Sequence, residues 1–129
     1  MNDLSSARAA SASGMSAQAS RLRLISENIA NADTPGYHRK IVSFEQVLDS
    51  RDSRAVRTGR LQLDQSDLEE IYDPDHPLAD AQGNYDGSNV NILIEIADAQ
   101  EAQRSYEANL KMFDQARQMK ASLLDLLRR

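Results

Sequence analysis

The sequence predicts a mainly α fold: long N- and C-terminal helices pair as a coiled-coil-like hairpin, with an irregular, partly β middle insertion. Apolar residues repeat at heptad-like spacing near both ends of the chain, a Thr-Pro-Gly stop ends the first repeat, and the middle loses helical periodicity. We therefore divide the 129 residues into an N-terminal helix (1–33), a segment of turns, short strands and acidic extended chain (34–90), and a long C-terminal helix (91–129).

The first helix is predicted over about residues 4–32. Met15, Leu22 and Ile29 recur every seven residues, as in the apolar seam of a coiled coil. The N-terminal part of the pattern is weaker, since polar residues interrupt it and Gly14 inside a helix costs about 1 kcal/mol. We expect this half of the helix to be poorly ordered without partners.

The end of the first helix is marked by two asparagines and a Pro-Gly turn. Asn28 and Asn31 lie three residues apart, so they share one helix face near a terminus whose last carbonyls need polar partners. Pro35 prevents further helix, and Gly36 can adopt the positive φ that a tight turn requires. The chain must change direction before Tyr37.

The second helix is predicted over residues 91–127 and would be about 54 Å long. It is too long for the first helix to cover, so an apolar stripe must remain exposed, as in helices that associate between chains. An isolated antiparallel hairpin is the alternative. Asn109 lies beside the stripe, where a polar side chain can fix helix register; a solvent-facing position is equally open.

The middle of the chain alternates between short strand patterns and turn residues. Residues 41–47 and 61–63 read as short strands, and residues 51–60 as a polar, basic connection. Proline and glycine exclude helix from 72–80 and 83–87, and favour an extended segment with turns that can lie along the helices.

Composition and charge narrow the classes of function. The net charge of −5 argues against non-specific nucleic-acid binding, which needs a positive surface. Residues 61–101 hold eleven acidic side chains and no Lys or Arg, whereas residues 1–60 hold nine basic and six acidic ones. The acidic band is either solvated or contacts a basic band on a neighbouring subunit. Scarce aromatics (5%) and abundant alanine limit burial in a monomer, which favours oligomerisation.

Targeting and membrane signals are absent from the sequence. Residues 1–14 lack the basic start and continuous apolar stretch of a secretory signal, and no run is long enough to span a bilayer. If the protein leaves the cytosol, we expect another export route.

No enzyme signature is found. Asp73, Asp75, His76 and Asp80 form the only cluster resembling a hard-cation site, but the order of a calcium loop is missing, so we expect no metal and acids that are solvated or paired with Arg. His38 has no identified nucleophile or orienting carboxylate and reads as a surface residue. Without cysteine or a phosphate-binding loop, the sequence predicts no catalytic residue and no cofactor.

Three regions resemble the flagellar basal-body rod proteins, most closely the C-type subunits of the proximal rod. Residues 26–32 (Ser-Glu-Asn-Ile-Ala-Asn-Ala) with the following Thr-Pro-Gly-Tyr are similar to the N-terminal motif of rod and hook proteins. Residues 72–91 resemble the C-type strap, and residues 104–109 (Arg-Ser-Tyr-Glu-Ala-Asn) the C-terminal motif. The turn at 33–37 is compact, as in the B-type rod subunit, so that subunit type stays an alternative.

The resemblance implies a non-enzymatic structural subunit that self-assembles with other rod proteins and with copies of itself. It also implies torque transmission, a place in the wall of the export channel, and a periplasmic location. Export would use the flagellar type III apparatus without a cleaved signal peptide. A soluble helical adaptor or export chaperone is the alternative, which should form a discrete oligomer in solution. A hydrolase using Asp73, Asp75 and His76 ranks third.

On this interpretation the apolar stripes and the turn carry the contacts between subunits, with Asn28, Asn31 and Asn109 as candidates for setting register. The predicted interface residues are Met15, Leu22, Ile25, Asn28, Ile29, Asn31, Pro35, Tyr37, Ile92, Ile96, Ala99, Tyr106, Asn109, Leu110, Phe113, Leu124 and Leu127.

Overall fold

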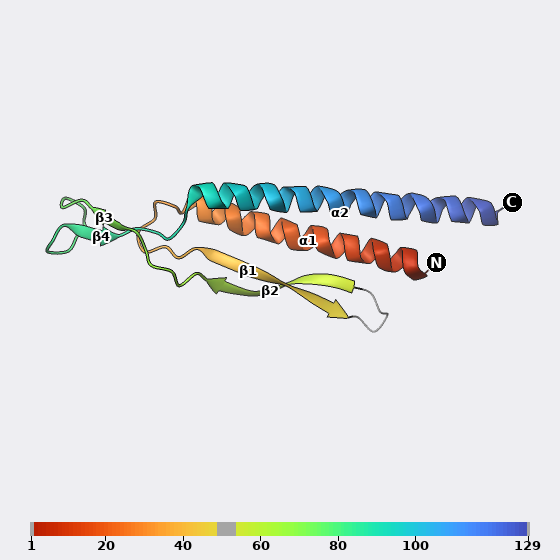
Figure 1. The fold of residues 1–129 in the computed structure, drawn as a ribbon, viewed down its shortest axis with the longest axis horizontal. Helices are drawn as coiled ribbons and strands as arrows, with labels where there is room; N and C mark the ends of the chain where they lie inside the picture. Colours follow the sequence, from red (N-terminus) through yellow and green to blue (C-terminus); the bar gives the residue numbers. More distant parts are fainter. Residues whose placement is uncertain (1, 49–53, 129) are drawn as a thin grey trace.

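Two long antiparallel helices and two small antiparallel hairpins make up the fold. The computed structural model describes residues 2–48 and 54–128. The elements, in chain order, are α1 (Asn2–Ala30), β1 (Lys40–Leu48), β2 (Arg54–Leu63), β3 (Glu70–Tyr72), β4 (Asn84–Asp86) and α2 (Ile92–Leu127). α1 packs against α2 on one side and against the β1–β2 hairpin on another, while the β3–β4 hairpin projects beyond the end of the helix pair (Figure 1). The predicted fold class is confirmed.

α1 is continuous through Gly14, the residue that weakened its predicted N-terminal half. Gly14 is buried, and a Cβ added there would lie 2.7 Å from Oδ1 of Asn109 on α2. The missing side chain therefore lets Asn109 lie directly over the α1 backbone, with its Nδ2 donating to the Ser105 carbonyl at 2.9 Å. How ordered this half is without partners stays a prediction.

The core between the helices is narrow and built from small residues. Among the described hydrophobic residues, only Ala17, Ile25, Ala102 and Ala116 are buried. Most of the large apolar residues of the predicted stripes flank this seam and are half-buried or exposed. Because alanine side chains bury little area, the hydrophobic stabilisation of the isolated chain is small for its length.

α2 is longer than α1, with 36 residues against 29, and its C-terminal end extends past the start of α1 (Figure 1). Asn91 caps its N-terminus, because Oδ1 accepts from the backbone N–H groups of Leu93 at 3.1 Å and Ile94 at 3.4 Å. As expected from its length, α2 keeps exposed apolar side chains along its course. These are Ile92, Leu93, Ile94, Ile96, Leu110, Met112, Met119, Leu123, Leu124, Leu126 and Leu127.

The β1–β2 hairpin is more regular than the sequence suggested. Residues 54–60, predicted as part of a polar connection, belong to β2, whereas residues 51–53 lie outside the described chain. Arg57 lies opposite Glu45 and pairs with it at 3.4 Å, so a polar segment is compatible with a strand. Val56 ties β2 to α1 by donating its N–H to Ser13 Oγ at 2.9 Å.

The β3–β4 hairpin forms from the segment predicted to be extended with turns. Ile71 of β3 pairs with Tyr85 of β4. The Tyr85 ring stacks on the His76 ring, with 3.9 Å between the ring centroids and an interplanar angle of 10°. Gly83 turns the chain with a φ of +87° that favours glycine. The hairpin lies beyond the helix pair and not along it, because strand pairing folds the segment back on itself (Figure 1).

We predict a non-additive pair of substitutions where Gly14 on α1 lies against Asn109 on α2. Gly14→Ala alone should give little or no stabilisation, because the new methyl group displaces the Asn109 side chain. In an Asn109→Ala background the same change should stabilise the fold by about 1 kcal/mol, the helix preference of alanine over glycine. Urea unfolding followed by circular dichroism measures both; equal effects in the two backgrounds would contradict the close approach.

Candidate functional site

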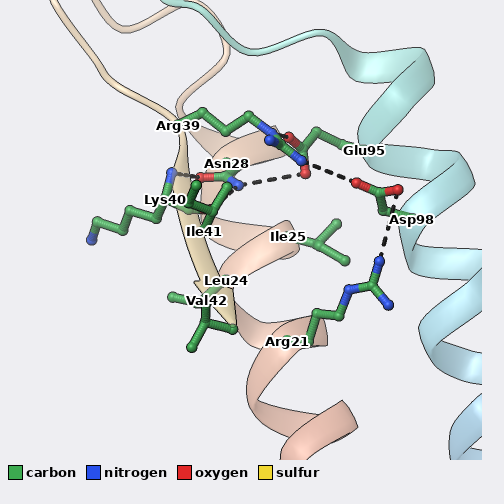
Figure 2. A pocket seen from close by; sticks show the side chains of 10 residues that line it. All are labelled: Arg21, Leu24, Ile25, Asn28, Arg39, Lys40, Ile41, Val42, Glu95 and Asp98. Atoms are coloured by element: carbon green, nitrogen blue, oxygen red, sulfur yellow. Dashed lines mark hydrogen bonds and ion pairs between the residues drawn. The ribbon is translucent and has the colours of Figure 1, made fainter. Parts of the chain in front are cut away.

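A cluster of polar side chains joins the end of α1, the start of β1 and the first turns of α2. We call Arg21, Asn28, Arg39, Glu95 and Asp98 the polar junction (Figure 2). Together with the apolar residues Leu24, Ile25, Ile41 and Val42, and with Lys40, they line a small cavity.

Asn28 connects α1 to the backbone at the start of β1. Its Oδ1 accepts from the Lys40 N–H at 2.9 Å and its Nδ2 donates to the Lys40 carbonyl at 2.9 Å, so the side-chain amide pairs with Lys40 as a neighbouring strand would. Nδ2 also lies 3.4 Å from Glu95 Oε2, and Asn28 is only 1% exposed. An amide with donor and acceptor in one plane is what this position requires.

Tyr37 adds a further hydrogen bond to the Asn28 side chain. Its hydroxyl donates to Asn28 Oδ1 at 2.9 Å. Burial raises the pKa of Tyr37 above its ordinary value; the positive charge of Lys40 opposes this rise, and Glu27 and Glu95 add to it. The neutral, hydrogen-donating phenol is therefore the form that the fold favours.

Glu95 is fully buried and is held by Arg39. The guanidinium Nε of Arg39 donates to Glu95 Oε1, and Asn28 approaches the other oxygen. Burial lowers the pKa of Arg39, but the hydrogen bond and charge of Glu95, with Asp98 and Asp64, outweigh it and raise the pKa above its ordinary value. The buried carboxylate is thus charge-paired and hydrogen-bonded, as burial of an ion requires.

The pairing continues down α2 and back to the strand segment. Arg39 Nη2 donates to Asp98 at 3.0 Å, and Nη1 lies 3.6 Å from Asp64. Arg21 on α1 lies 3.8 Å from the same Asp98 and 3.5 Å from Glu101. A chain of ion pairs therefore fixes the position of α2 along α1.

The segment entering α2 is anchored by side chains as well. Asn89 Oδ1 accepts from the Arg39 N–H at 2.6 Å, and its Nδ2 donates to the Asp64 carbonyl at 2.9 Å. Ser88, which is buried, donates its hydroxyl to the Ala32 carbonyl just after α1. Both ends of the middle insertion are thus bound to each other at the junction.

The turn between α1 and β1 ends the helix as the sequence predicted. Gly36 has a φ of +74°, which confirms the expected positive φ, and its N–H lies 3.0 Å from the Gly87 carbonyl. Asn31 closes the helix end locally: its Nδ2 donates to the Glu27 carbonyl at 2.8 Å and its Oδ1 accepts from the Thr34 hydroxyl at 3.1 Å. Asn28 and Asn31 share the helix end but have different partners.

The predicted interface residues fall into three groups in this chain. Ile25 and Asn28 are buried in contacts within the chain. The half-buried members are Met15, Leu22, Asn31, Pro35, Tyr37, Ala99, Tyr106, Asn109 and Phe113. The exposed members are Ile29, Ile92, Ile96, Leu110, Leu124 and Leu127.

Some of the half-buried and exposed members border a groove beside the helix pair. It is lined by Ala19 and Leu22 of α1 and by Gln103, Tyr106, Glu107 and Leu110 of α2. Its lining is mostly apolar, so it offers a surface on which another helix can bury area.

Sequence reasoning missed the charged members of the junction, Arg21, Arg39, Glu95 and Asp98. One signal was present: Glu95 lies between Ile92 and Ile96 in the apolar pattern, where an acid requires a partner once buried. In the candidate cation cluster, the Asp80 side chain is used in turn hydrogen bonds. Asp80 accepts backbone N–H groups from Gln82 and Asn84, both at 2.9 Å, and within residues 2–48 and 54–128 no three potential ligands converge as a metal site.

Ionisation of Tyr37 should destabilise the junction at high pH. Its pKa is raised on folding, so its contribution to stability is fully present below about pH 10, the ordinary value, and is lost as pH rises through the folded pKa. Tyr37→Phe should lower stability near pH 7 by about 0.5–1.5 kcal/mol, the value of one hydrogen bond, and should reduce the loss at high pH. Urea midpoints from pH 7 to 11 test this; identical alkaline losses in both proteins would refute it.

Neither helix of the described chain has the length and apolar character that a membrane crossing requires.

Comparisons with known proteins agree with this architecture. A family model described as flagella basal body rod protein matches residues 9–38, and one for the C-terminal region of the flagellar basal body rod FlgEFG proteins matches residues 81–126. The chain is 46% identical to the flagellar basal-body rod protein FlgC of Agrobacterium fabrum, covering 99% of this chain and 98% of the relative. FlgC of Bacillus subtilis is 32% identical over 90% and 93% of the two chains, and FlgC of Salmonella typhimurium 30% over 88% and 90%. The chain belongs to the FlgC family of flagellar basal-body rod proteins.

Proposed function

We propose that this chain is a structural subunit of the proximal rod of the flagellar basal body. In this role it assembles with other rod proteins and with its own copies, transmits torque, and contributes to the wall of the export channel. Family membership supports the assignment to the rod. The exposed apolar stripe on α2 carries the structural part of the proposal, because such surfaces on a small protein mark contacts with partners.

The geometry of the polar junction and the groove is compatible with a subunit that transmits torque to its neighbours. The polar junction holds α1, β1 and α2 in one arrangement through a buried ion pair and through hydrogen bonds to the backbone. The helix pair presents apolar groove residues outward from this fixed frame. We propose that Leu22, Tyr106 and Leu110 contact a helix of a neighbouring rod subunit, and that the exposed members of the predicted interface extend this contact.

The location and export route belong to the same proposal. We propose that the subunit lies in the periplasmic part of the basal body and reaches it through the flagellar type III apparatus without a cleaved signal peptide. Partners would be other rod proteins during assembly and the export apparatus before it. The C-type assignment rests on 46% identity to an FlgC protein over 99% of this chain.

Deletion of the gene in the source bacterium should abolish swimming and leave basal bodies with rings but without a completed rod or hook. A plasmid copy should restore both. Complete rods and normal swimming in the deletion strain, with no second gene copy, would reject the proposal. A discrete oligomer of the purified chain in analytical ultracentrifugation would instead favour a soluble adaptor.

Within that strain, Leu110→Glu on the plasmid should prevent swimming. Burying the exposed Leu110 side chain against a partner would contribute at most about 1.5–3 kcal/mol per subunit, and a charge at this position would instead have to be desolvated. Ala108→Glu is the matched control, since it adds the same charge to an exposed position of α2 outside the groove lining. Leu110→Glu cells that swim as well as Ala108→Glu cells would count against the groove as an interface.

A further inference from the structure

The two histidines of the chain make opposite kinds of hydrogen bond. His38 Nδ1 lies 3.1 Å from the Asp64 carbonyl, to which it can only donate, so both the neutral and the protonated ring can make this contact. His76 Nδ1 instead accepts the backbone N–H of Leu78 at 3.1 Å. A ring nitrogen accepts only when it carries no proton, so this contact requires a neutral His76 with its proton on Nε2.

His76 also connects two parts of the β3–β4 hairpin. Its ring stacks on that of Tyr85 in β4, while its Nδ1 holds the N–H of Leu78 in the turn that follows. The same turn is closed by the Ala79 N–H, which donates to the His76 carbonyl at 3.0 Å. The side chain therefore joins the 76–79 turn to a strand of the hairpin, which projects beyond the helix pair (Figure 1).

A pocket on this hairpin depends on both contacts of the His76 side chain. Its volume is about 180 Å³. Its lining residues are Glu70, Leu78, Asp80, Asn84, Tyr85 and Asp86. His76 is not among them, but it holds Leu78 through the backbone N–H and Tyr85 through the stacked ring. The shape of the pocket is therefore tied to the state of one histidine.

A protonated His76 has other partners within the hairpin. Residues 69–87 include no Lys or Arg, and within the described chain none of their six acids forms an ion pair. The titratable groups around the ring are Tyr85, on which it stacks, and the carboxyl groups of Glu69, Glu70, Asp73, Asp75, Asp80 and Asp86. With a proton on Nδ1, two donors face each other at Leu78, so the ring must turn away, and a carboxylate can accept from it instead.

We propose that His76 is a pH-sensitive switch in the β3–β4 hairpin. The neutral ring holds the Leu78 N–H and the wall of the pocket, whereas protonation removes the acceptor, releases the 76–79 turn and changes the shape of the pocket. β3 and β4 stay paired in both states, because their ladder joins backbone groups. The inference does not rest on the proposed rod function.

Nuclear magnetic resonance of the isotopically labelled, full-length chain tests the switch between about pH 8 and 5, the range in which histidine ordinarily changes charge. At the upper limit, the His76 ring should carry its proton on Nε2 and none on Nδ1. On acidification, the resonances of the Leu78 amide and the Tyr85 ring should move with the same midpoint as the His76 ring. Protection of the Leu78 amide against exchange, corrected for the intrinsic effect of pH, should fall about three- to tenfold, the loss of one hydrogen bond.

Two substitutions at this position are matched controls. His76→Asn supplies an oxygen acceptor that does not titrate, placed two residues before the N–H that it accepts, as Asp80 is before Gln82. Its Leu78 amide should stay protected across the range. His76→Phe keeps an aromatic ring for stacking but has no acceptor, so its Leu78 amide should be unprotected at every pH.

Three results would overturn the switch. The first is a proton on His76 Nδ1 at pH 8, and the second is a Leu78 amide that does not respond while the His76 ring titrates. The third is the same pH response in His76→Asn, which would assign the change to the carboxyl groups. Circular dichroism of the same samples reports the helices; a loss of helix that is equal in the unsubstituted chain and in His76→Asn would also overturn the switch, because the change would then be global. The His38 contact with the Asp64 carbonyl should persist throughout, since it survives protonation.

Discussion

The buried ion pair between Arg39 and Glu95 is the constraint on which the rest of the structure depends. Glu95 is 0% exposed at the first turn of α2, and a carboxylate there is tolerable only because Arg39, just before β1, and Asn28 on α1 both reach it. Asn28 in turn pairs with both backbone groups of Lys40, next to Arg39. One network therefore sets where the chain leaves α1, where β1 begins and how α2 lies along α1.

Beyond this junction the described chain buries few large apolar side chains. The seam between α1 and α2 is made of alanine, glycine and a few larger residues, while leucine, isoleucine and methionine side chains along α2 remain exposed. Small residues allow close helix approach but contribute little burial. This division suits the proposed role in the rod: a specific polar junction holds the shape of the single molecule, and the larger apolar surface is left exposed for the contacts with neighbours that we propose.

The sequence was enough to predict the two helices and the turn, because the apolar periodicity and the Pro-Gly pair act on local structure. The family was predicted from three short motifs. Gly36 was expected to take a positive φ and does so at +74°. The strand over 54–60 was missed, since its stability comes from pairing across the hairpin, as between Arg57 and Glu45, and not from local propensity. Gly14 was interpreted as weakening the first helix. Its structural role is to leave room for the Asn109 side chain, and this could not be predicted because Asn109 is distant in sequence. The junction was missed for the same reason: Arg39 and Glu95 are 56 residues apart.

A double-substitution cycle at this pair is the most direct measurement. Arg39→Met alone leaves the buried Glu95 carboxylate without its charged partner, and we expect it to lower the free energy of unfolding by about 3–5 kcal/mol. Glu95→Leu alone should destabilise the fold less, because it removes the acceptor of the Arg39 Nε–H group but leaves Asp98 and Asp64 beside the guanidinium. The double variant should recover most of that loss, because neither charge is then left unpaired. Strictly additive losses in urea unfolding, or an Arg39→Met loss below about 1 kcal/mol, would contradict the claim that this ion pair holds the junction together.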